Sequence, residues 1–241
     1  MLIAILSDIH GNFRALEAVL DDIDSCSVEE IISLGDNIGY GPEPEEVIKT
    51  LQKKNILSVM GNHELALAKP SYLAGLNPDA KISLEIQLQM ISPDNINYCT
   101  ALPKIMIRHG ARFIHGCPPR SLTSYLYYPS MQKMERIFAG YPERFCFFGH
   151  LHSFERYILD NHSCRYEQPV LGNYQCMNRA RYLLNPGSVG QPRDGINRKA
   201  KYGLWDIDAD TFELRAVPYD SATTKKLLRQ HNFPEMNSAR L

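Results

Sequence analysis

The segment LIAILSDIHGN (residues 2–12) joins a short apolar run to a loop rich in polar side chains. The run at residues 2–6 is fully apolar, which is typical of a strand. Residues 12–23 then place leucine, valine and isoleucine at helical spacing. We therefore predict a strand that leads directly into a helix, with Asp8 and His10 in the turn between them.

The alternation of strand and helix continues along the chain. Residues 31–34 and 56–60 have the pattern of strands, and residues 44–53 have that of a helix with proline in its first turn. Strands that alternate with helices predict a parallel sheet. Residues 64–100 look mainly helical but are divided by prolines. These prolines are Pro70, Pro78 and Pro93.

The second half of the chain favours strands. Residues 105–108 and 111–114 flank His109-Gly110 in the manner of a hairpin, and a helix is predicted near residues 130–139. Further strands are predicted at residues 145–148, 154–159, 182–184, 202–207 and 212–217. Two stacked sheets with helices on their outer faces account for this order better than one very wide sheet. We therefore expect a layered α/β fold.

The composition is that of a globular protein without a strongly charged partner. A chain of 241 residues that is 44% hydrophobic can bury a large core, and no composition shift marks a linker. We expect residues 1–241 to form a single domain. Lys and Arg number 26 against 27 for Asp and Glu, so the net charge of -1 provides no basic field and makes nucleic acid an improbable partner.

Neither a membrane segment nor a disulfide framework is predicted. Asp8 and His10 interrupt the apolar start, and no run of about 18 uncharged residues indicates a membrane helix. The six cysteines form no CxxC pair, so we expect reduced thiols and a cytoplasmic protein. No coiled coil or single amphipathic interface stands out, and the sequence leaves the oligomeric state open.

Five clusters of potential metal ligands each follow a predicted strand. Loops at the carboxyl ends of parallel strands lie at one edge of a sheet, so these clusters can converge. Asp, Asn and His without Cys suit a pair of divalent ions, manganese foremost, with iron, zinc or nickel as alternatives. The clusters are Asp8-Ile9-His10, Gly35-Asp36, Gly61-Asn62-His63-Glu64, His115-Gly116 and Gly149-His150-Leu151-His152.

Asp36 is our candidate for the residue between the two ions. Two ions about 3.5–4 Å apart need a bridging carboxylate, which also offsets part of their repulsion. Gly35, Gly61 and Gly149 suit strands that turn sharply toward a metal, because such turns tolerate little Cβ bulk. The alternative is that these glycines simply end their strands.

In this order, the motifs DxH, GD, GNHE, HG and GHxH resemble those of the calcineurin-like metallophosphoesterases, from residue 1 to about residue 195. The resemblance implies a four-layer α-β-β-α sandwich, in which two mixed sheets pack face to face between flanking helices. It also implies two metal sites that share one aspartate. The first site would consist of Asp8, His10, Asp36 and His152, and the second of Asp36, Asn62, His115 and His150.

Two further segments refine the resemblance. NPGSVGQPR (residues 185–193) resembles the tail signature of a compact bacterial and archaeal branch of phosphodiesterases and phosphatases. After Asp36 the chain continues NIGYGP, whereas members acting on phosphoproteins and some dinucleoside polyphosphates usually carry an acidic residue and an Arg there. His63 is thereby left without the family's usual carboxylate partner, which argues against a protein Ser/Thr phosphatase.

We therefore expect a metal-dependent phosphoric ester hydrolase that cleaves phosphodiester or phosphomonoester bonds in a small substrate. In this hypothesis a hydroxide bridging the two ions attacks phosphorus in line, and His63 protonates the leaving group as general acid. Asn12, Tyr40 and Arg193 are candidate substrate contacts. Their alternative roles are a helix cap, loop packing and a solvated charge, respectively.

Other functions compete with this hypothesis. Within the enzyme class, a Ser/Thr protein phosphatase or a dinucleoside polyphosphate hydrolase is the alternative. Outside it, a scaffold such as the retromer subunit uses the same fold for partner binding without metals, but a full ligand set argues against that reading. Residues 64–100 and 117–130 are expected to form the walls of the substrate site. Tyr125, Tyr127 and Tyr128 could stack on a base or sugar, or pack against the sheet.

Overall fold

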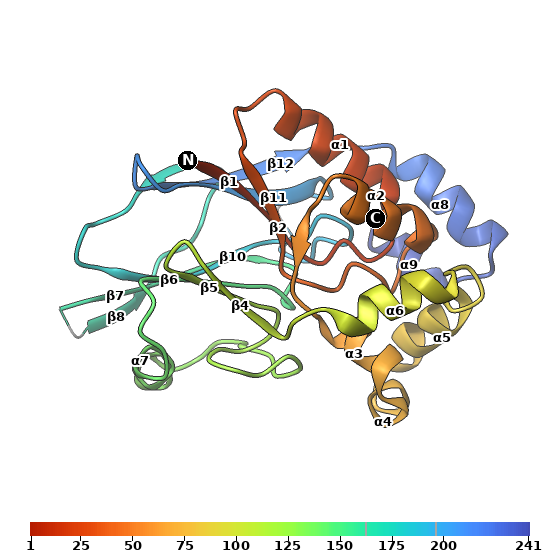
Figure 1. The fold of residues 1–241 in the computed structure, drawn as a ribbon, viewed down its shortest axis with the longest axis horizontal. Helices are drawn as coiled ribbons and strands as arrows, with labels where there is room; N and C mark the ends of the chain where they lie inside the picture. Colours follow the sequence, from red (N-terminus) through yellow and green to blue (C-terminus); the bar gives the residue numbers. More distant parts are fainter. Residues whose placement is uncertain (162, 196) are drawn as a thin grey trace.

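Two six-stranded sheets form the centre of the molecule, as Figure 1 shows for the computed structural model. The structure describes residues 1–161, 163–195 and 197–241. The first sheet contains β1 (Leu2–Leu6), β2 (Glu30–Ser33), β3 (Leu57–Ser58), β9 (Gly172–Gln175), β11 (Ala200–Asp206) and β12 (Thr211–Val217). The second contains β4 (Ile105–Arg108), β5 (Ala111–Ile114), β6 (Phe145–Phe148), β7 (Phe154–Asp160), β8 (Ser163–Tyr166) and β10 (Arg181–Pro186).

Both sheets are mixed. The strand order is β3-β2-β1-β11-β12-β9 in the first sheet and β4-β5-β6-β10-β7-β8 in the second. Strands β1, β2 and β3 run parallel to one another, as do β5, β6 and β10, and the other pairs are antiparallel. Each parallel group brings its carboxyl ends to one edge of its sheet, where the ligand-rich loops begin.

Helices cover the outer faces of both sheets. They are α1 (Phe13–Asp24), α2 (Pro44–Lys53), α3 (Asn62–Ala68), α4 (Pro70–Ala74), α5 (Pro78–Gln87), α6 (Pro93–Ala101), α7 (Met131–Ala139), α8 (Ser221–Gln230) and α9 (Glu235–Ala239). Helices α1 and α2 pack on the first sheet, and α7 packs on the second (Figure 1). The predicted four-layer arrangement is confirmed.

The position of β1 explains its uninterrupted apolar run. Ile3 and Ile5 lie in the core between the two sheets, together with Phe113 and Phe147 of the second sheet. Ala4 and Leu6, on the opposite face of the same strand, lie in the cluster beneath α1. Because a strand covered on both faces has no solvent side, it shows no alternation of apolar and polar residues.

Most predicted elements have the expected bounds, with some differences. Helix α2 and the hairpin strands β4 and β5 match the prediction, and Pro70, Pro78 and Pro93 each begin a helix, where a missing N–H is harmless. Strand β3 is shorter than predicted, and β8, β9, α8 and α9 were not predicted. Among the helices described, we find none with the length and apolarity needed to cross a bilayer.

Candidate metal centre

The seven predicted metal ligands meet where the loops after β1, β2, β3, β5 and β6 come together. Backbone hydrogen bonds hold the loops to one another. The N–H of Asp8 donates to the carbonyl of Gly35 (3.1 Å), and the N–H of Gly149 donates to the backbone carbonyl of His115 (2.8 Å). All seven side chains are buried. They are Asp8, His10, Asp36, Asn62, His115, His150 and His152.

A first group brings together Asp8, His10 and His152, whose ligand atoms lie close enough to hold one metal ion. Oδ1 of Asp8 is 3.3 Å from Nε2 of His152 and 3.8 Å from Nε2 of His10, and the two Nε2 atoms are 3.1 Å apart. The other ring nitrogens donate to backbone carbonyls: Nδ1 of His10 to Ile38 (2.9 Å) and Nδ1 of His152 to Gln191 (2.7 Å). Both Nε2 lone pairs therefore point toward Asp8.

The two oxygens of Asp8 have different surroundings. Oδ2 accepts hydrogen bonds from the Ser7 hydroxyl (2.6 Å) and from the backbone N–H of His150 (3.1 Å). Oδ1 is buried and has no hydrogen-bond donor among the described residues. Burial also raises the pKa of Asp8 to about 6. An acceptor oxygen facing two imidazole lone pairs in a dry site is unfavourable without a cation, so this group fits a metal ion.

A second group comprises Asp36, His115 and His150, with Asn62 beside them. Oδ2 of Asp36 is 3.2 Å from Nε2 of His115, which is 3.0 Å from Oδ1 of Asn62 and 3.2 Å from Nδ1 of His150. These four donor atoms converge on a point adjacent to the first group. They form a nitrogen and oxygen set of the kind that borderline divalent ions accept.

Backbone carbonyls also orient the histidines of the second group. Nδ1 of His115 faces the carbonyl of Leu34 (2.9 Å), and Nε2 of His150 faces that of Thr123 (3.2 Å). Burial lowers the pKa of His150 to about 3. At His115 burial also lowers the pKa, but the carboxylates of Asp36, Asp8 and Glu64 together outweigh it and raise the pKa to about 9. The surroundings of His115 thus favour a positive charge at this point.

Asp36 lies next to both groups. Its Oδ1 accepts a hydrogen bond from the backbone N–H of His63 (2.9 Å), which leaves Oδ2 near Nε2 of His115 and 3.8 Å from Nε2 of His10. Burial by itself would raise the pKa of Asp36, but the neighbouring histidines His115 and His63 hold it well below its usual range. The carboxylate is therefore ionised between the two groups, as a bridging ligand must be.

Five of the seven predicted ligands adopt the left-handed backbone conformation. Non-glycine residues rarely take positive φ angles, and each costs on the order of 1–3 kcal/mol unless its surroundings enforce it. Such conformations cluster at functional sites. The residues and their φ angles are Asp8 (52°), His10 (52°), Asp36 (52°), His150 (70°) and His152 (59°).

Close approach explains two of the glycines in the motifs. A Cβ atom on Gly61 would lie 2.1 Å from Oδ1 of Asp36, and one on Gly149 would lie 2.1 Å from the Ser7 hydroxyl oxygen. Both distances are far below a van der Waals contact. These glycines therefore do more than end their strands, because they let two loops approach the carboxylates.

His63 occupies a position beside the two groups. It is buried, its ring lies 4.9 Å from that of His10 and 5.1 Å from that of Tyr40, and its Nε2 is 3.8 Å from Oδ2 of Asp36. Its Nδ1 has no hydrogen-bond partner among the described residues, so no carboxylate orients the ring. Burial lowers its pKa. The ligand atoms of His63, His10 and Asp36 also lie close enough to one another to hold a metal ion.

Glu64 points away from His63 and organises the loop after β2. Its Oε2 accepts the backbone N–H of Asp36 (3.0 Å) and of Gly61 (2.8 Å), and its Oε1 accepts that of Asn37 (2.8 Å). This buried carboxylate thus holds the Asp36 and Asn62 loops together. Its position in the GNHE motif was visible in the sequence, but its role was not.

Gln87 supports the same loop and was not predicted from the sequence. Its Oε1 accepts the N–H of Gly39 (2.7 Å), and its Nε2 donates to the carbonyl of Gly41 (2.6 Å). The residue is fully buried near the end of α5, more than forty positions from the loop that it holds. Nothing in the local sequence pattern signals this contact.

The three predicted substrate contacts have different positions. Asn12 caps α1, with Oδ1 accepting from the N–H of Ala15 (3.2 Å) and Nδ2 donating to the carbonyl of Gly190 (2.9 Å), so its side chain is already engaged. Tyr40 and Arg193 both line a cavity of about 440 Å³ that opens onto the metal centre. The Arg193 guanidinium lies 5.4 Å from the centre of the Tyr40 ring.

The walls of this cavity come from the two segments that we expected. Tyr72 and Asn77 contribute from residues 64–100, and Thr123 and Tyr125 from residues 117–130. The Tyr125 ring stacks on His150, with ring centres 3.8 Å apart. Tyr125 therefore packs on a metal-ligand candidate rather than on the sheet.

Comparisons with known proteins agree with this geometry. A family model described as the calcineurin-like phosphoesterase superfamily domain matches residues 1–210. The crystal structure of a metallophosphoesterase from Sphaerobacter thermophilus is 32% identical, with a TM-score of 0.83, over 100% of this chain and 97% of that one. An uncharacterized protein from Methanocaldococcus jannaschii is 32% identical over 100% of this chain and 97% of its own. The crystal structure of a hypothetical protein from Pyrococcus horikoshii shares the fold, with a TM-score of 0.76 and 21% identity. The match covers 99% of this chain and 96% of that one.

Proposed function

The chain belongs to the calcineurin-like phosphoesterase superfamily and is a phosphoric ester hydrolase, and from this we propose that it cleaves phosphodiesters with two divalent metal ions. The observation that carries the proposal is the convergence of imidazole lone pairs and buried carboxylate oxygens on two adjacent points beside Asp36. Oδ1 of Asp8 supports it, because this buried oxygen has no hydrogen-bond donor among the residues that the structure describes.

Each of the two proposed ions would be held by four protein ligands, and Asp36 would belong to both sets. The first set is Asp8, His10, Asp36 and His152, and the second is Asp36, Asn62, His115 and His150. Bound ions neutralise charge on the phosphoryl oxygens and lower the pKa of water, so that it can attack phosphorus near neutral pH. Manganese is the ion we expect, with iron, zinc or nickel as alternatives.

His63 is the proposed proton donor to the leaving group. It lines the cavity beside Asp36 and Asn62, and its Nδ1 is engaged by no other described residue. Burial lowers its pKa, but a negatively charged phosphate ester in the same cavity would favour the protonated ring. The ring can then release its proton to the leaving oxygen as the ester bond breaks.

Arg193 and Tyr40 are the proposed substrate contacts. The guanidinium offers paired N–H donors that suit phosphoryl oxygens. Among the described residues that line the cavity, Arg193 is the one with a permanent positive charge. Beside the two proposed ions, this guanidinium can pair with a negatively charged phosphoryl oxygen of the substrate.

The test compares hydrolysis of bis-p-nitrophenyl phosphate with that of p-nitrophenyl phosphate in the presence of Mn²⁺. We expect faster cleavage of the diester, and we expect both a chelator and Asp36→Asn to abolish it. The exposed Asp94→Asn serves as the matched control and should retain activity. Hydrolysis that survives chelation would contradict the proposal. A protein that takes up no metal would instead point to the scaffold alternative.

A further inference from the structure

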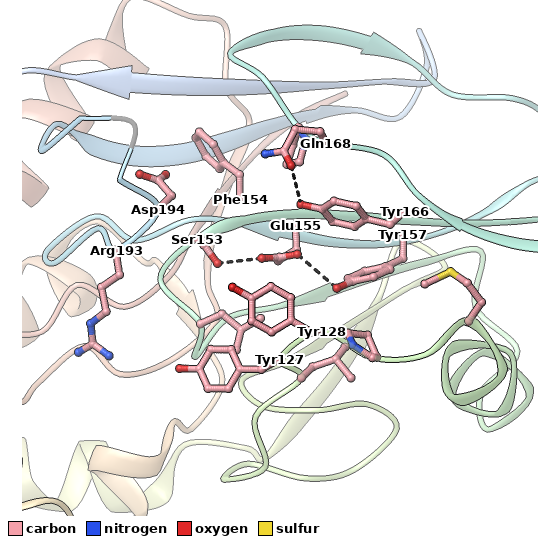
Figure 2. Close-up of a pocket in the computed structure, with 15 residues that line it drawn as sticks. Tyr127, Tyr128, Ser153, Phe154, Glu155, Tyr157, Tyr166, Gln168, Arg193 and Asp194 are labelled. Carbon is pink, nitrogen blue, oxygen red and sulfur yellow. Dashed lines mark hydrogen bonds between the residues drawn. The ribbon is translucent and has the colours of Figure 1, made fainter.

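A second hollow of about 670 Å³ adjoins the catalytic cavity. Arg193 lines both spaces and therefore marks the junction between them. Figure 2 shows the hollow with Glu155 at its middle, Tyr127 and Tyr128 on one side, and Tyr166 and Gln168 on the other. Apart from Arg193, the residues that line this hollow have no part in the metal centre or in the proposed mechanism.

A row of stacked aromatic rings leads from the metal centre to the hollow. Tyr125 stacks on His150, and Tyr127 stacks on Tyr125 with ring centres 5.0 Å apart and planes 10° apart. Tyr125 lines the catalytic cavity, whereas Tyr127 lines the second hollow. Tyr127 is 56% exposed, so part of its ring is available to a flat ligand.

The loop that carries these rings is anchored at two points. The carbonyl of Thr123 accepts the hydrogen bond from Nε2 of His150. Leu126, between the two stacked tyrosines, is 1% exposed and lies in the core cluster with Met134 of α7. The aromatic row is therefore a fixed surface rather than a set of mobile side chains, and a ligand that stacks on it loses little free energy to ordering the loop.

Glu155 provides a hydrogen-bond acceptor in the hollow. Its Oε1 accepts from the Ser153 hydroxyl (2.9 Å), and its Oε2 accepts from the Tyr157 hydroxyl (3.3 Å), as the dashed lines in Figure 2 show. These two bonds fix the carboxylate and use one of the acceptor positions on each oxygen. The remaining positions can accept N–H or O–H groups of a ligand.

The charges in the hollow disfavour a second phosphate there. Its charged lining residues among those described are Glu155, Asp194 and, at the junction, Arg193. Lys201, fully buried in β11, donates to Oδ1 of Asp194 and so binds the segment next to Arg193 to the sheet. An anionic group is thus favoured at Arg193, and a neutral group with hydrogen-bond donors is favoured beyond it.

We propose that the second hollow binds the nucleoside part of a nucleotide phosphodiester whose phosphate lies at the metal centre. The base would stack on Tyr127, and the N–H groups of the base or the hydroxyls of the sugar would donate to Glu155. A nucleoside has a flat base, carries N–H and O–H donors and forms phosphate esters through its sugar, which fits all three features of the hollow. This inference rests on the proposed function and adds a substrate class to it.

The test uses two diesters that release the same leaving group. These are the p-nitrophenyl ester of thymidine 5′-phosphate and ethyl p-nitrophenyl phosphate. In each, the oxygen of water bonds to phosphorus, the bond to p-nitrophenolate breaks, and the nucleoside or ethyl group stays on the phosphate. The ratio of the two kcat/KM values therefore isolates the contribution of the nucleoside. We expect the ratio to be about tenfold or more in the native protein, from base stacking.

Variants of the hollow should change only the nucleoside ester. Tyr127→Ala and Glu155→Gln are expected to remove most of the ratio and to leave kcat/KM for the ethyl ester unchanged. Tyr127→Phe keeps the ring and should behave like the native protein. Glu85→Gln, on the exposed face of α5, is the control for the loss of one carboxylate. Equal losses on both esters, or a ratio near one in the native protein, would overturn the inference.

Binding of thymidine itself separates the inference from the proposed function. Saturation-transfer NMR on chelator-treated protein should show contact with the base protons, and Tyr127→Ala should lose it. If neither ester is hydrolysed, the proposed function fails, and this binding measurement then decides the inference alone. Thymidine that fails to bind, or that binds equally well to Tyr127→Ala, counts against the hollow as a nucleoside site.

Discussion

The four imidazoles of the metal centre are oriented by backbone carbonyls, and this is the level of detail that the sequence reveals least. The order of Asp, Asn and His motifs was enough to predict which side chains meet. It could not predict that His150 presents Nδ1 while His115 presents Nε2, because the carbonyls of Thr123 and Leu34 decide this. Any residue type supplies a carbonyl, so the pattern leaves no trace in the sequence.

Asn12 illustrates the same limit at a substrate contact. The sequence allowed either a helix cap or a ligand to the substrate, since an asparagine at the start of a helix suits both. The structure shows the cap, through Ala15, and a further bond to the carbonyl of Gly190, nearly two hundred positions away. Long-range partners of this kind cannot be predicted from local sequence patterns.

His63→Ala distinguishes a proton donor from a metal ligand. We expect the variant to retain its bound metal but to lose turnover by roughly 10²–10⁴-fold on esters with poor leaving groups, and by less with p-nitrophenolate, which needs no proton. Metal content by plasma mass spectrometry and kcat across a series of leaving groups are the measurements. The exposed His231→Ala is the control.

Loss of metal from His63→Ala would have a different meaning. Since His63 also groups with His10 and Asp36, such a loss would make it a ligand and would leave the proton donor to be found elsewhere in the cavity.

At the scale of elements, strands followed by ligand clusters were predictable and the polar C-terminal helices were not. Helix α8 buries only Thr224 and Leu228, so it lacks an apolar stripe. A start signal was nevertheless present, since Asp220 caps the helix by accepting the N–H of Thr223 (3.0 Å). Strand β9 is an edge strand that pairs with β12 alone among the described strands, and its polar residues resemble those of a loop.

The short helix α9 connects the C-terminal region to the substrate cavity. Asn237, 1% exposed, donates to the carbonyl of Tyr40 (2.8 Å) and to the Ser83 hydroxyl (2.8 Å). It therefore holds the loop after Asp36 against α5. No feature of the sequence near residue 237 indicates that this helix supports the site.

Asn237→Ala should destabilise the protein without removing its metal. The change leaves the Tyr40 carbonyl and the Ser83 hydroxyl without this donor in a buried place, which costs about 1–3 kcal/mol. Urea unfolding should show this loss, and KM for the diester should rise because Tyr40 lines the cavity. Met236→Ala, its exposed neighbour, should change stability by no more than about 0.5 kcal/mol. An unchanged unfolding midpoint in Asn237→Ala would show that α9 does not support the loop.

At the scale of the whole molecule, the stability depends on the aromatic core between the sheets. Phe147 of β6 lies 5.3 Å from Phe113 in its own sheet and 5.2 Å from Trp205 in the other, measured between ring centres. The loops that carry His115 and His150 begin at the ends of β5 and β6, whereas those that carry Asp8 and Asp36 begin at the ends of β1 and β2 in the other sheet. Packing between the sheets therefore also sets the separation of the two halves of the metal centre.

Phe147→Ala should cost about 3–5 kcal/mol of unfolding free energy, because it removes a fully buried ring that both sheets contact. Denaturant unfolding with and without Mn²⁺ would measure it. Ile107→Ala, on an exposed position of β4, should have a small effect. A loss below about 1 kcal/mol would mean that the core relaxes around the cavity.

In the proposed metal centre, loops from both sheets together hold two metal ions, with Asp36 between them. Anomalous diffraction from crystals grown with Mn²⁺ tests it most directly. We expect two anomalous peaks about 3.5–4 Å apart, one beside Asp8, His10 and His152 and the other beside Asn62, His115 and His150, with Asp36 touching both. A single peak, or two peaks without Asp36 between them, would contradict it.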